Sequence, residues 1–354
     1  MSAQRISSLT PLADVLARVA ALARLVTPRE VAVQDAEGRV LAVDVFAGPW
    51  PVALTALTDG WAVRAEQVAD AGPYAPTLLT APPMWVDAGA PMPRNTDAIL
   101  PPDAVAGAEV HAAVTAGDGV LAADADAVPE RPLRRAGERL RAADVAALQA
   151  VGISRVSVRE PRVRVVSADA DAAALAIARG VAAHGANVVF VRALERALAE
   201  EADALIAVGG TGAGSRDRSV DLLAHAGIVD IHGFGLSPGE TSALGRVGAQ
   251  PVLLLPARLD AALAAFLVVG SAFLRGFTGS LISPGMRVTL ARKIVSTVGL
   301  AEVVPVRLTE QGAAPLASGH WPMQALTRAD GWVPVPPESE GFAAGATLEM
   351  RAFP

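Results

Sequence analysis

The apolar residues follow a helical spacing at the start of the chain and shorter runs after it. Thr10 suits an N-cap, Pro11 suits the first helical position, and apolar side chains then recur every three or four residues as far as Val26. This spacing predicts an amphipathic helix. From about 45 to 135, short β-like runs such as GWAVRA, PMWVDAGAPMP and DAILPP are broken by Pro, Gly and Asp. AADVAALQAVGI (142–153) returns to a helical pattern.

From about residue 161, strand-like and helix-like segments alternate. RVRVVS, NVVFVRA and ALIAVGG resemble buried strands, and AALAIARGVAAHG, a segment near 194–202 and one from about 217 resemble helices. PVLLLP (251–256) and a helix over 259–275 complete this unit. Such alternation predicts a parallel sheet flanked by helices.

After Pro284 the chain returns to short β runs: MRVTLARKI, AEVVPVRL, DGWVPVP and ATLEMRAF. They predict a small all-β terminal domain, barrel-like in form. With 354 residues the chain exceeds one ordinary core, so we expect two to four domains.

Composition narrows the chemistry. The net charge of −6 argues against nucleic acid as the main partner. The single lysine, Lys293, excludes any mechanism that needs a lysine elsewhere. Because the chain has no cysteine, disulfides, thiolate zinc sites and thiol nucleophiles are excluded. The five histidines, at 111, 184, 225, 232 and 320, show no metal-ligand spacing, and helix capping is the better interpretation of His184 and His225.

The sequence gives no sign of a membrane partner. The N-terminus lacks a basic region followed by an apolar stretch, so we expect no secretory signal. The longest apolar helix candidate, AALAAFLVVGSAFL (261–274), is shorter than the roughly 20 residues of a membrane span and predicts a buried core helix. We therefore expect a cytoplasmic protein.

A glycine-rich loop follows the strand-like ALIAV. Gly209, Gly210, Gly212 and Gly214 stand where the strands of α/β sheets bind ligands, and backbone N–H groups followed by a helix favour an anion. Two alternatives remain open. The loop can be a plain strand-to-helix turn, or a loose G-x-G-x-G dinucleotide loop with Asp230 as the ribose-binding acid.

Seven segments in unbroken order resemble one family. They are TDGWAVR (58–64), VDAGAPMPRNTDAILPPD (86–103), RRAGERLRAADV (134–145), DALIAVGGTGAGSRD (203–217), LSPGETSALGRV (236–247), PVLLLPARLDAALAAF (251–266) and ASGHWPMQALTRADGWVPVP (317–336). Together they are similar to the molybdopterin molybdenumtransferase family, which includes MoeA and the gephyrin E domain, over nearly the whole chain.

The resemblance implies an α+β multidomain fold. An elongated N-terminal domain comprises 1–45 plus 135–160, with a β-rich domain inserted at 46–134. A three-layer α/β molybdopterin-binding domain follows at 161–283, and a C-terminal β-barrel at 284–354. It also implies insertion of molybdate into adenylylated molybdopterin with release of AMP, assisted by Mg²⁺. As partners it implies a second copy of the chain, a molybdopterin-adenylylating protein or a molybdoenzyme client.

The resemblance further implies roles for four aspartates. Asp59 matches the family's D-G-Y-A-V-R motif, and Asp203 opens the strand before the glycine loop. Asp217 matches the later of two aspartates after that loop, and Asp171 replaces a glutamate of S-T-G-D-E, here SADAD. All four are implied to be catalytic, with Asp59, Asp203 and Asp217 as metal ligands. For each aspartate alone, a cap or turn role is an equally good interpretation. The implied cofactor-binding residues are Ser167, Gly209, Gly210, Thr211, Gly212, Gly214, Ser237, Pro238, Gly239 and Arg258.

The expected anion site departs from the family. In SPGET, Ser237 and Glu240 stand where two lysines are expected, and Gly212 replaces a serine. The L-P-G-N-P turn is LPARL (255–259), in which Arg258 can supply a positive charge. Two expected arginines fall at about Leu300 and Pro305, and an expected serine falls at His320. A carboxylate in place of a cation turns attraction of an anion into repulsion.

Two functional hypotheses follow. One is a molybdenum-inserting enzyme, which the retained aspartates and glycines favour. The other is a catalytically impaired relative that binds a molybdopterin as a chaperone, scaffold or regulator, which the lost lysines favour.

Overall fold

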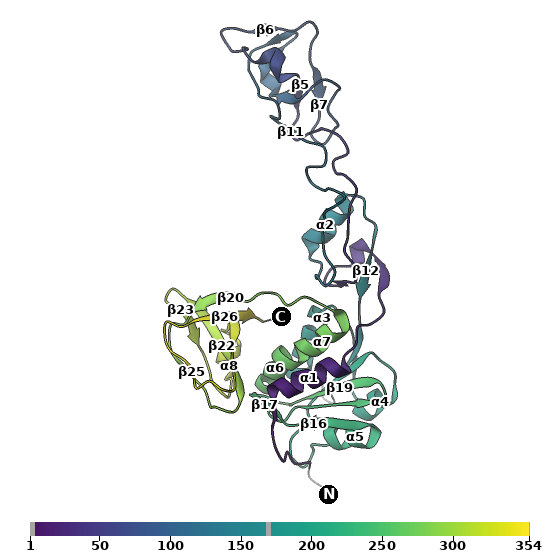
Figure 1. The fold of residues 1–354 in the computed structure, drawn as a ribbon, viewed down its shortest axis with the longest axis vertical. Helices are drawn as coiled ribbons and strands as arrows, with labels where there is room; N and C mark the ends of the chain where they lie inside the picture. Colours follow the sequence, from purple (N-terminus) through teal and green to yellow (C-terminus); the bar gives the residue numbers. More distant parts are fainter. Residues whose placement is uncertain (1–3, 168–170, 354) are drawn as a thin grey trace. The chain divides into compact units, whose positions relative to one another are not determined.

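The computed structural model describes residues 4–167 and 171–353, in two compact units (Figure 1). Unit 1 comprises residues 1–43, 136–145 and 155–354. Unit 2 comprises residues 44–135 and 146–154.

Unit 2 is built from very short antiparallel strands, as the broken β-like runs predict. Its central strand β5 (Gly60–Val63) lies between two others, β7 (Met84–Val86) and β8 (Ala98–Leu100). The remaining elements are β4 (Thr55–Ala56) with β11 (Val120–Leu121), the ladder β6 (Thr77–Leu78), β10 (Glu109–Val110) and β9 (Val105–Ala106), and the 3₁₀ turns η2 (Ala65–Val68) and η3 (Pro102–Ala104). Small apolar residues fill its core. The helix α2 (Ala142–Ala150) ends three residues before the predicted helical segment does.

A six-stranded sheet forms the centre of unit 1. Its order is β14 (Asn187–Val191), β13 (Arg162–Val166), β15 (Ala204–Val208), β19 (Gln250–Leu255), β18 (Ala243–Val247) and β16 (Ile228–His232). The first four strands are parallel, as the alternating pattern predicts. The last two are antiparallel additions that the sequence pattern did not reveal.

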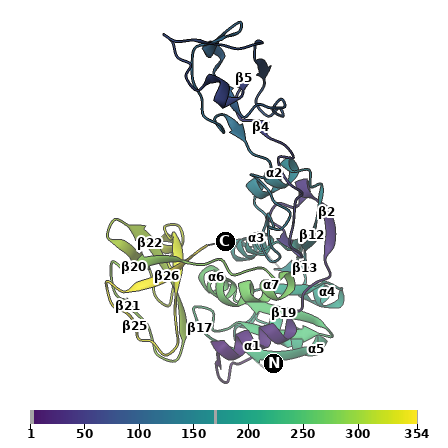
Figure 2. The same ribbon diagram turned by 45° about the horizontal axis from the view of Figure 1, so that its top comes forward.

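Helices cover both faces of this sheet (Figure 2). Alternate strand residues point to opposite faces, so Leu253 packs under one helical layer and Leu254 under the other. The first layer contains α1 (Leu12–Leu22), α3 (Ala172–Ala183), α6 (Leu259–Ala265) and α7 (Ser271–Thr278), and the second contains α4 (Leu194–Ala199) and α5 (Ser219–Ala226). The predicted N-terminal helix α1 thus buries its apolar side, through Val15 and Val19, within its own chain.

The predicted terminal β runs all form strands, but their sheet is larger than the terminal segment. It is seven-stranded and contains β1 (Thr10–Pro11), β17 (Phe234–Ser237), β22 (Ala301–Thr309), β24 (Gly331–Val335), β26 (Thr347–Ala352), β20 (Met286–Thr289) and β23 (Gly312–Pro315). The pair β21 (Ile294–Val295) and β25 (Gly341–Phe342) and the helix α8 (Met323–Leu326) complete this region. Because β17 pairs in parallel with β22, the chain just after β16 is joined directly to the terminal sheet.

A smaller sheet of unit 1 consists of β2 (Arg29–Ala32), β12 (Arg155–Arg159) and β3 (Val40–Leu41). The 3₁₀ turn η1 (Val33–Asp35) directly follows β2 in the chain. Its strands come from both ends of the segment that encloses unit 2. The buried carboxylate of Glu160 forms ion pairs with Arg29 and Arg39.

The predicted core helix is longer than its sequence pattern indicates. A continuous helical stretch runs from Leu259 to Thr278, through α6, the π-helical turn η4 (Phe266–Gly270) and α7. Within the described residues it is the one helix long and apolar enough to cross a membrane, and 72% of its most apolar window is buried in the fold. The expected length was therefore wrong, whereas the expected burial agrees with the structure.

Candidate functional site

Three loops meet at the carboxyl edge of the parallel strands. They are the glycine loop (Gly209–Asp217), the SPG turn (Ser237–Thr241) and the arginine turn (Leu255–Asp260). The Gly209 N–H donates to the Leu255 carbonyl (2.8 Å), and the hydroxyls of Thr211 and Thr241 share a hydrogen bond of 3.1 Å. The topology therefore unites segments separated by up to about fifty residues, as α/β sheets do at their ligand-binding edge.

The glycine loop needs its first two glycines for the shape of its backbone. Gly209 and Gly210 have φ angles of 101° and 73°, in the left-handed region. A Cβ at Gly210 would lie 2.4 Å from the hydroxyl oxygen of Ser219. That hydroxyl donates to the Gly209 carbonyl (2.8 Å), and the Ser219 N–H donates to the Gly210 carbonyl (2.9 Å). Ser219 thus ties the start of α5 to the loop.

The side chain of Gln4 occupies the helix end that the sequence suggested for an anion. Its amide nitrogen donates to the carbonyls of Gly210 (2.7 Å) and Gly212 (2.8 Å). Its oxygen accepts the N–H groups of Val220 (3.1 Å) and Asp221 (3.2 Å) in the first turn of α5. Gln4 is only 8% exposed. These amides are already paired, so the anion-binding surface must be provided by other groups.

Asp217 closes the glycine loop from within. Its carboxylate accepts the Gly214 N–H (2.9 Å), and its own N–H donates to the Gly214 carbonyl (3.0 Å). A Cβ at Gly212 would lie 2.7 Å from the same carboxylate. The family-based match therefore places Asp217 in the site, in contact with the loop backbone. Arg216 and Arg218 on either side are exposed.

The SPG turn presents a carboxylate to this edge. Glu240 is partly buried, and its side chain accepts the N–H of Gly239 (3.0 Å). Gly239 has φ 132°, and a Cβ there would lie 3.2 Å from the Ala265 side chain of α6. Ser237 and Pro238 precede it in the turn, at the end of β17. The turn is thus packed tightly against α6, with a negative charge where the family comparison predicts a lysine.

The arginine turn adds a further positive charge, Arg258. The Arg258 guanidinium binds the Asp260 carboxylate through Nε (3.0 Å) and Nη2 (2.6 Å). This hydrogen bond, together with the charges of Asp260 and Glu240, raises the pKa of Arg258 despite partial burial. Burial alone would raise the pKa of Asp260, but bonds from Arg258, the Trp321 backbone and His320 outweigh burial and hold that pKa far below its usual value.

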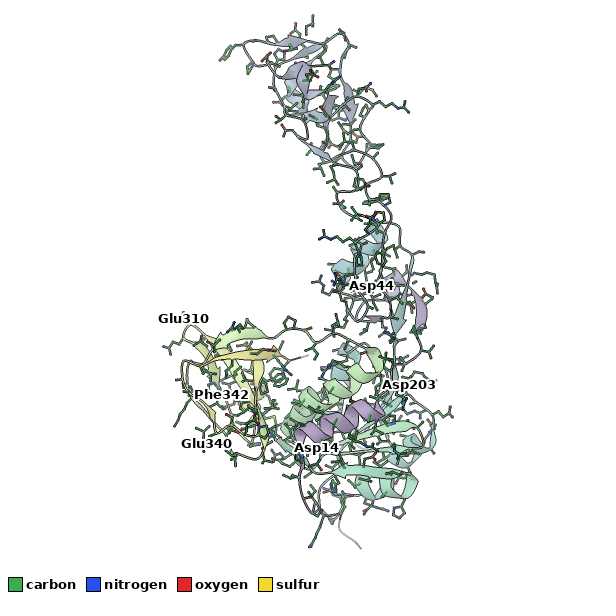
Figure 3. All side chains as sticks on the ribbon, viewed as in Figure 1. Asp14, Asp44, Asp203, Glu310, Glu340 and Phe342 are labelled. Atoms are coloured by element: carbon green, nitrogen blue, oxygen red, sulfur yellow. The ribbon has the colours of Figure 1, made fainter. Side chains whose placement is uncertain are left out.

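Three predicted aspartates lie outside these three loops. Asp171 is the N-cap of α3, where it accepts the Ala174 N–H (2.8 Å). Asp203 (Figure 3) precedes β15, at the amino edge of the sheet, and accepts the Arg162 N–H (2.6 Å). The five residues of β15 separate it from the glycine loop, a span of about 16 Å at about 3.3 Å per residue. Asp59, in unit 2, is exposed and accepts the Ala88 N–H (2.7 Å).

The arrangement does not support the expected magnesium ligands. Asp203 and Asp217 lie at opposite edges of the sheet. Across residues 4–167 and 171–353, no three side chains of His, Asp or Glu are grouped so that they could hold a metal ion. The structure thus provides no fit for Mg²⁺ among these residues.

Two further sequence predictions concern Ser167 and the histidines. Ser167 is buried just after β13, where its N–H donates to the Val191 carbonyl (3.2 Å). The other part of SADAD, residues 168–170, lies outside the described residues. His184 and His225 cap helix ends as predicted, since their Nδ1 atoms bond to the carbonyls of Gly180 (2.7 Å) and Asp221 (2.6 Å).

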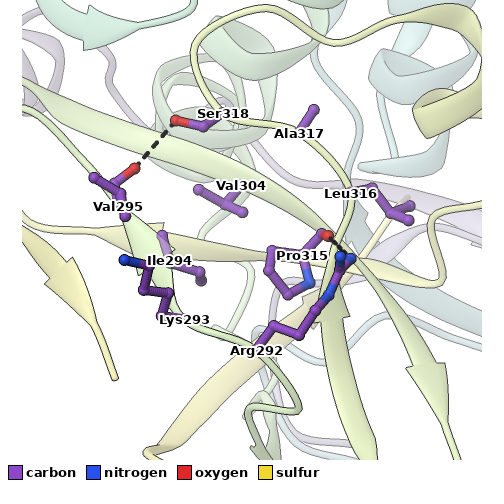
Figure 4. Close-up of a pocket in the computed structure, with 9 residues that line it drawn as sticks. All are labelled: Arg292, Lys293, Ile294, Val295, Val304, Pro315, Leu316, Ala317 and Ser318. Carbon is purple, nitrogen blue, oxygen red and sulfur yellow. Dashed lines mark hydrogen bonds between the residues drawn. The ribbon is translucent and has the colours of Figure 1, made fainter. Parts of the chain in front are cut away.

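The terminal sheet has a separate hollow of about 390 Å³ (Figure 4). Arg292 and Lys293 line one side of it, and Ser318 lines another. Arg292 donates to the Pro315 carbonyl (2.8 Å), and the Ser318 hydroxyl lies 3.2 Å from the Val295 carbonyl. The single lysine therefore belongs to this hollow and not to the three loops.

The fold and the loop arrangement agree with comparisons to known proteins. Residues 10–152 match the model of the "MoeA N-terminal region (domain I and II)", and residues 164–276 match the "Probable molybdopterin binding domain". The chain belongs to the MoeA family of molybdenum cofactor biosynthesis proteins.

Individual relatives extend the match to nearly the whole chain. Molybdopterin molybdenumtransferase 2 of Mycobacterium tuberculosis is 27% identical over 403 aligned positions, which cover 94% of this chain and 96% of the relative. Two crystal structures of MoeA from Pyrococcus horikoshii share the fold of this chain. One has a TM-score of 0.75 at 20% identity, covering 98% of this chain and all of that one. The other has a TM-score of 0.70 at 23% identity, covering 98% and 99%.

Proposed function

We propose that this protein inserts molybdate into adenylylated molybdopterin and releases AMP. Its family and its M. tuberculosis relative, named a molybdopterin molybdenumtransferase, support this assignment. The structural observation that carries it is the convergence of the glycine loop, the SPG turn and the arginine turn at one edge of the sheet. Such an edge suits a phosphate-bearing ligand.

The chemistry needs groups that hold two anions. In this chain we assign the donors to Arg258 and to glycine-loop N–H groups other than those of Gly209, Gly214 and Asp217, which are bonded within the fold. Arginine binds oxyanions through a planar fork of N–H groups. Asp217 keeps the loop in shape through Gly214. Ser167, Thr211, Ser237 and Pro238 lie in the same group of carboxyl-edge segments and are proposed as lining residues.

Glu240 lowers the affinity of this site for anions. It stands in the SPG turn, close enough to Arg258 for its charge to affect that residue's pKa. A carboxylate beside bound phosphate is repulsive. We therefore propose a weaker ligand affinity than in a relative with lysines in this turn.

A ligand titration tests the proposal. Molybdopterin and its adenylylated form are titrated into the wild-type protein, Glu240→Lys and Gly212→Val. Glu240→Lys should tighten binding about tenfold at low salt, equivalent to about 1.4 kcal/mol, and the gain should shrink as salt is added. Gly212→Val should weaken binding, since its side chain would collide with the Asp217 carboxylate. If neither variant changes the affinity, the loop is a structural turn and the proposal fails.

A further inference from the structure

We propose that Asp260 is a positioning residue: it orients Arg258 as the anion-binding cation of the three-loop site. Asp260 is itself held in place by His320 and the Trp321 backbone of the terminal sheet region. The anion's identity rests on the proposed function.

Asp260 is the buried member of the cluster. Only 3% of it is exposed, and it lies in the first turn of α6. A buried carboxylate is costly unless donors surround it. In addition to the two bonds from Arg258, its Oδ2 atom accepts from His320 Nδ1 (2.9 Å) and from the Trp321 N–H (3.0 Å). The negative charge of Asp260 is therefore surrounded by donors from Arg258, His320 and the Trp321 backbone.

Arg258 is the exposed member. Its side chain is 62% exposed, although its guanidinium is held by a bidentate contact. Arginine has five N–H donors, and Asp260 uses two of them, one on Nε and one on Nη2. Nη2 also lies 3.3 Å from His320 Nδ1, which leaves the two N–H groups of Nη1 for a ligand. A cation that is both oriented and exposed loses little conformational freedom when it binds an oxyanion.

The arginine turn, which carries this cation, packs against the glycine loop. Gly209 bonds to Leu255, and a Cβ at Gly209 would lie 3.7 Å from the Ala257 side chain. Arg258 is the next residue. The single lysine, Lys293, lies in the hollow of the terminal sheet, so the three-loop site has no lysine. The oriented Arg258 supplies the positive charge that a lysine would otherwise provide.

The terminal sheet supplies half of the anchor. Trp321 is fully buried and its indole N–H donates to the Val303 carbonyl of β22 (3.1 Å). The buried Glu302, which precedes Val303 in β22, accepts from the Ser318 hydroxyl (2.6 Å) and the Gly319 N–H (2.7 Å). The segment that carries His320 is thus fixed at both ends. His320 Nδ1 lies 2.9 Å from the Asp260 carboxylate and 3.3 Å from Arg258 Nη2, and we assign its hydrogen to the shorter contact, with the ionised Asp260 as acceptor.

The test uses the sign of a charge effect. Sodium molybdate is titrated calorimetrically into the full-length protein at low salt. Asp260→Asn and Glu240→Gln each remove one negative charge near Arg258, and a simple field effect would make both bind molybdate more tightly. We expect Glu240→Gln to tighten binding about threefold. We expect Asp260→Asn to weaken it about fivefold, because Arg258 loses its anchor.

A double-mutant cycle separates positioning from a general loss of structure. Arg258→Ala should weaken binding at least tenfold, and adding Asp260→Asn to that variant should not weaken binding further, because only the field effect of the lost negative charge remains. His320→Ala, at a 67% exposed side chain, should fold normally and weaken binding about twofold, and His320→Asn should restore most of it. Tighter or unchanged binding in Asp260→Asn, with wild-type binding intact, overturns this inference alone. A wild-type protein that binds no molybdate overturns the proposed function as well.

Discussion

At the scale of single residues, the site keeps its backbone and exchanges its charges. Gly209 and Gly210 retain conformations that require glycine, whereas Glu240 stands where a lysine is expected. Arg258 provides the compensating cation from a different turn. The four aspartates singled out by the sequence divide accordingly, since Asp217 lies in the glycine loop and Asp203 does not.

This division predicts different outcomes for two similar substitutions. Asp217→Asn should weaken ligand binding and lower turnover, because it loosens the Gly214 contact inside the loop. Asp203→Asn should leave turnover near wild type and reduce the free energy of unfolding by about 1 kcal/mol, through its bond to Arg162 at the amino edge. Steady-state assays and urea denaturation of both variants check this. A hundredfold loss of turnover in Asp203→Asn would return that residue to the mechanism.

The buried Asp260 predicts a pH-dependent stability. The pKa of Asp260 in the unfolded chain is about 3.9, and its pKa in the folded protein lies below that value. Ionisation of Asp260 therefore stabilises the fold fully above about pH 4. Asp260→Asn should therefore cost about 2 kcal/mol at pH 7. The difference from wild type should diminish as pH falls below about 4. Urea denaturation at several pH values measures it, and a difference independent of pH would contradict the ionised, multiply bonded state.

At the scale of elements, the glycine loop and α5 act with the chain's N-terminal segment. Gln4 bonds to two carbonyls of the loop and two N–H groups of α5. It connects residues more than 200 positions apart, which fixes the loop before any ligand binds.

Removing this side chain should mobilise the loop. In Gln4→Ala we expect faster hydrogen exchange for the amides of residues 210–221 and little change in the central strands. Gln4→Glu retains the acceptor and loses the donor, so its exchange should increase less on the α5 side than on the loop side. Exchange mass spectrometry distinguishes these patterns, and protection unchanged in both variants would show that the contact does not restrain the loop.

The sequence predicted the regular parts of these elements and missed the long-range ones. Alternating apolar runs identified β13, β14, β15 and β19 because each is a buried parallel strand with a clear pattern. The short β17 and the partly buried β16 carry no such pattern, and their pairing is set by tertiary contacts. Likewise, family motifs located the glycine loop and Arg258, but nothing in local spacing indicates that Gln4 or His320 reaches this edge.

At the scale of the whole molecule, the chain contains two compact units, and we propose a second copy of the chain as its partner. An apolar helix face without a partner would favour a dimer, but the apolar face of α1 packs within unit 1. The family resemblance remains as support. Unit 2 also exposes apolar side chains in one stretch, Phe46 (50%), Trp50 (39%) and Val52 (74%).

We predict that the protein is a dimer at micromolar concentration and that Val52→Asp shifts it towards monomer. The new charge would be buried without a partner in the interface and would be solvated in the free chain. Tyr74→Asp, at a fully exposed side chain outside this stretch, is the matched control and should remain dimeric. Sedimentation velocity measures both. A monomeric wild-type protein would contradict the dimer.

Molybdate-dependent release of AMP tests the proposed catalysis most directly. Purified protein is incubated with adenylylated molybdopterin, with and without molybdate, and AMP is followed by chromatography. We predict AMP release that requires molybdate, falls at least tenfold in Arg258→Ala and rises in Glu240→Lys. Tight binding of the adenylylated pterin without any molybdate-dependent AMP release would contradict the claim and identify a binding protein built on the same fold.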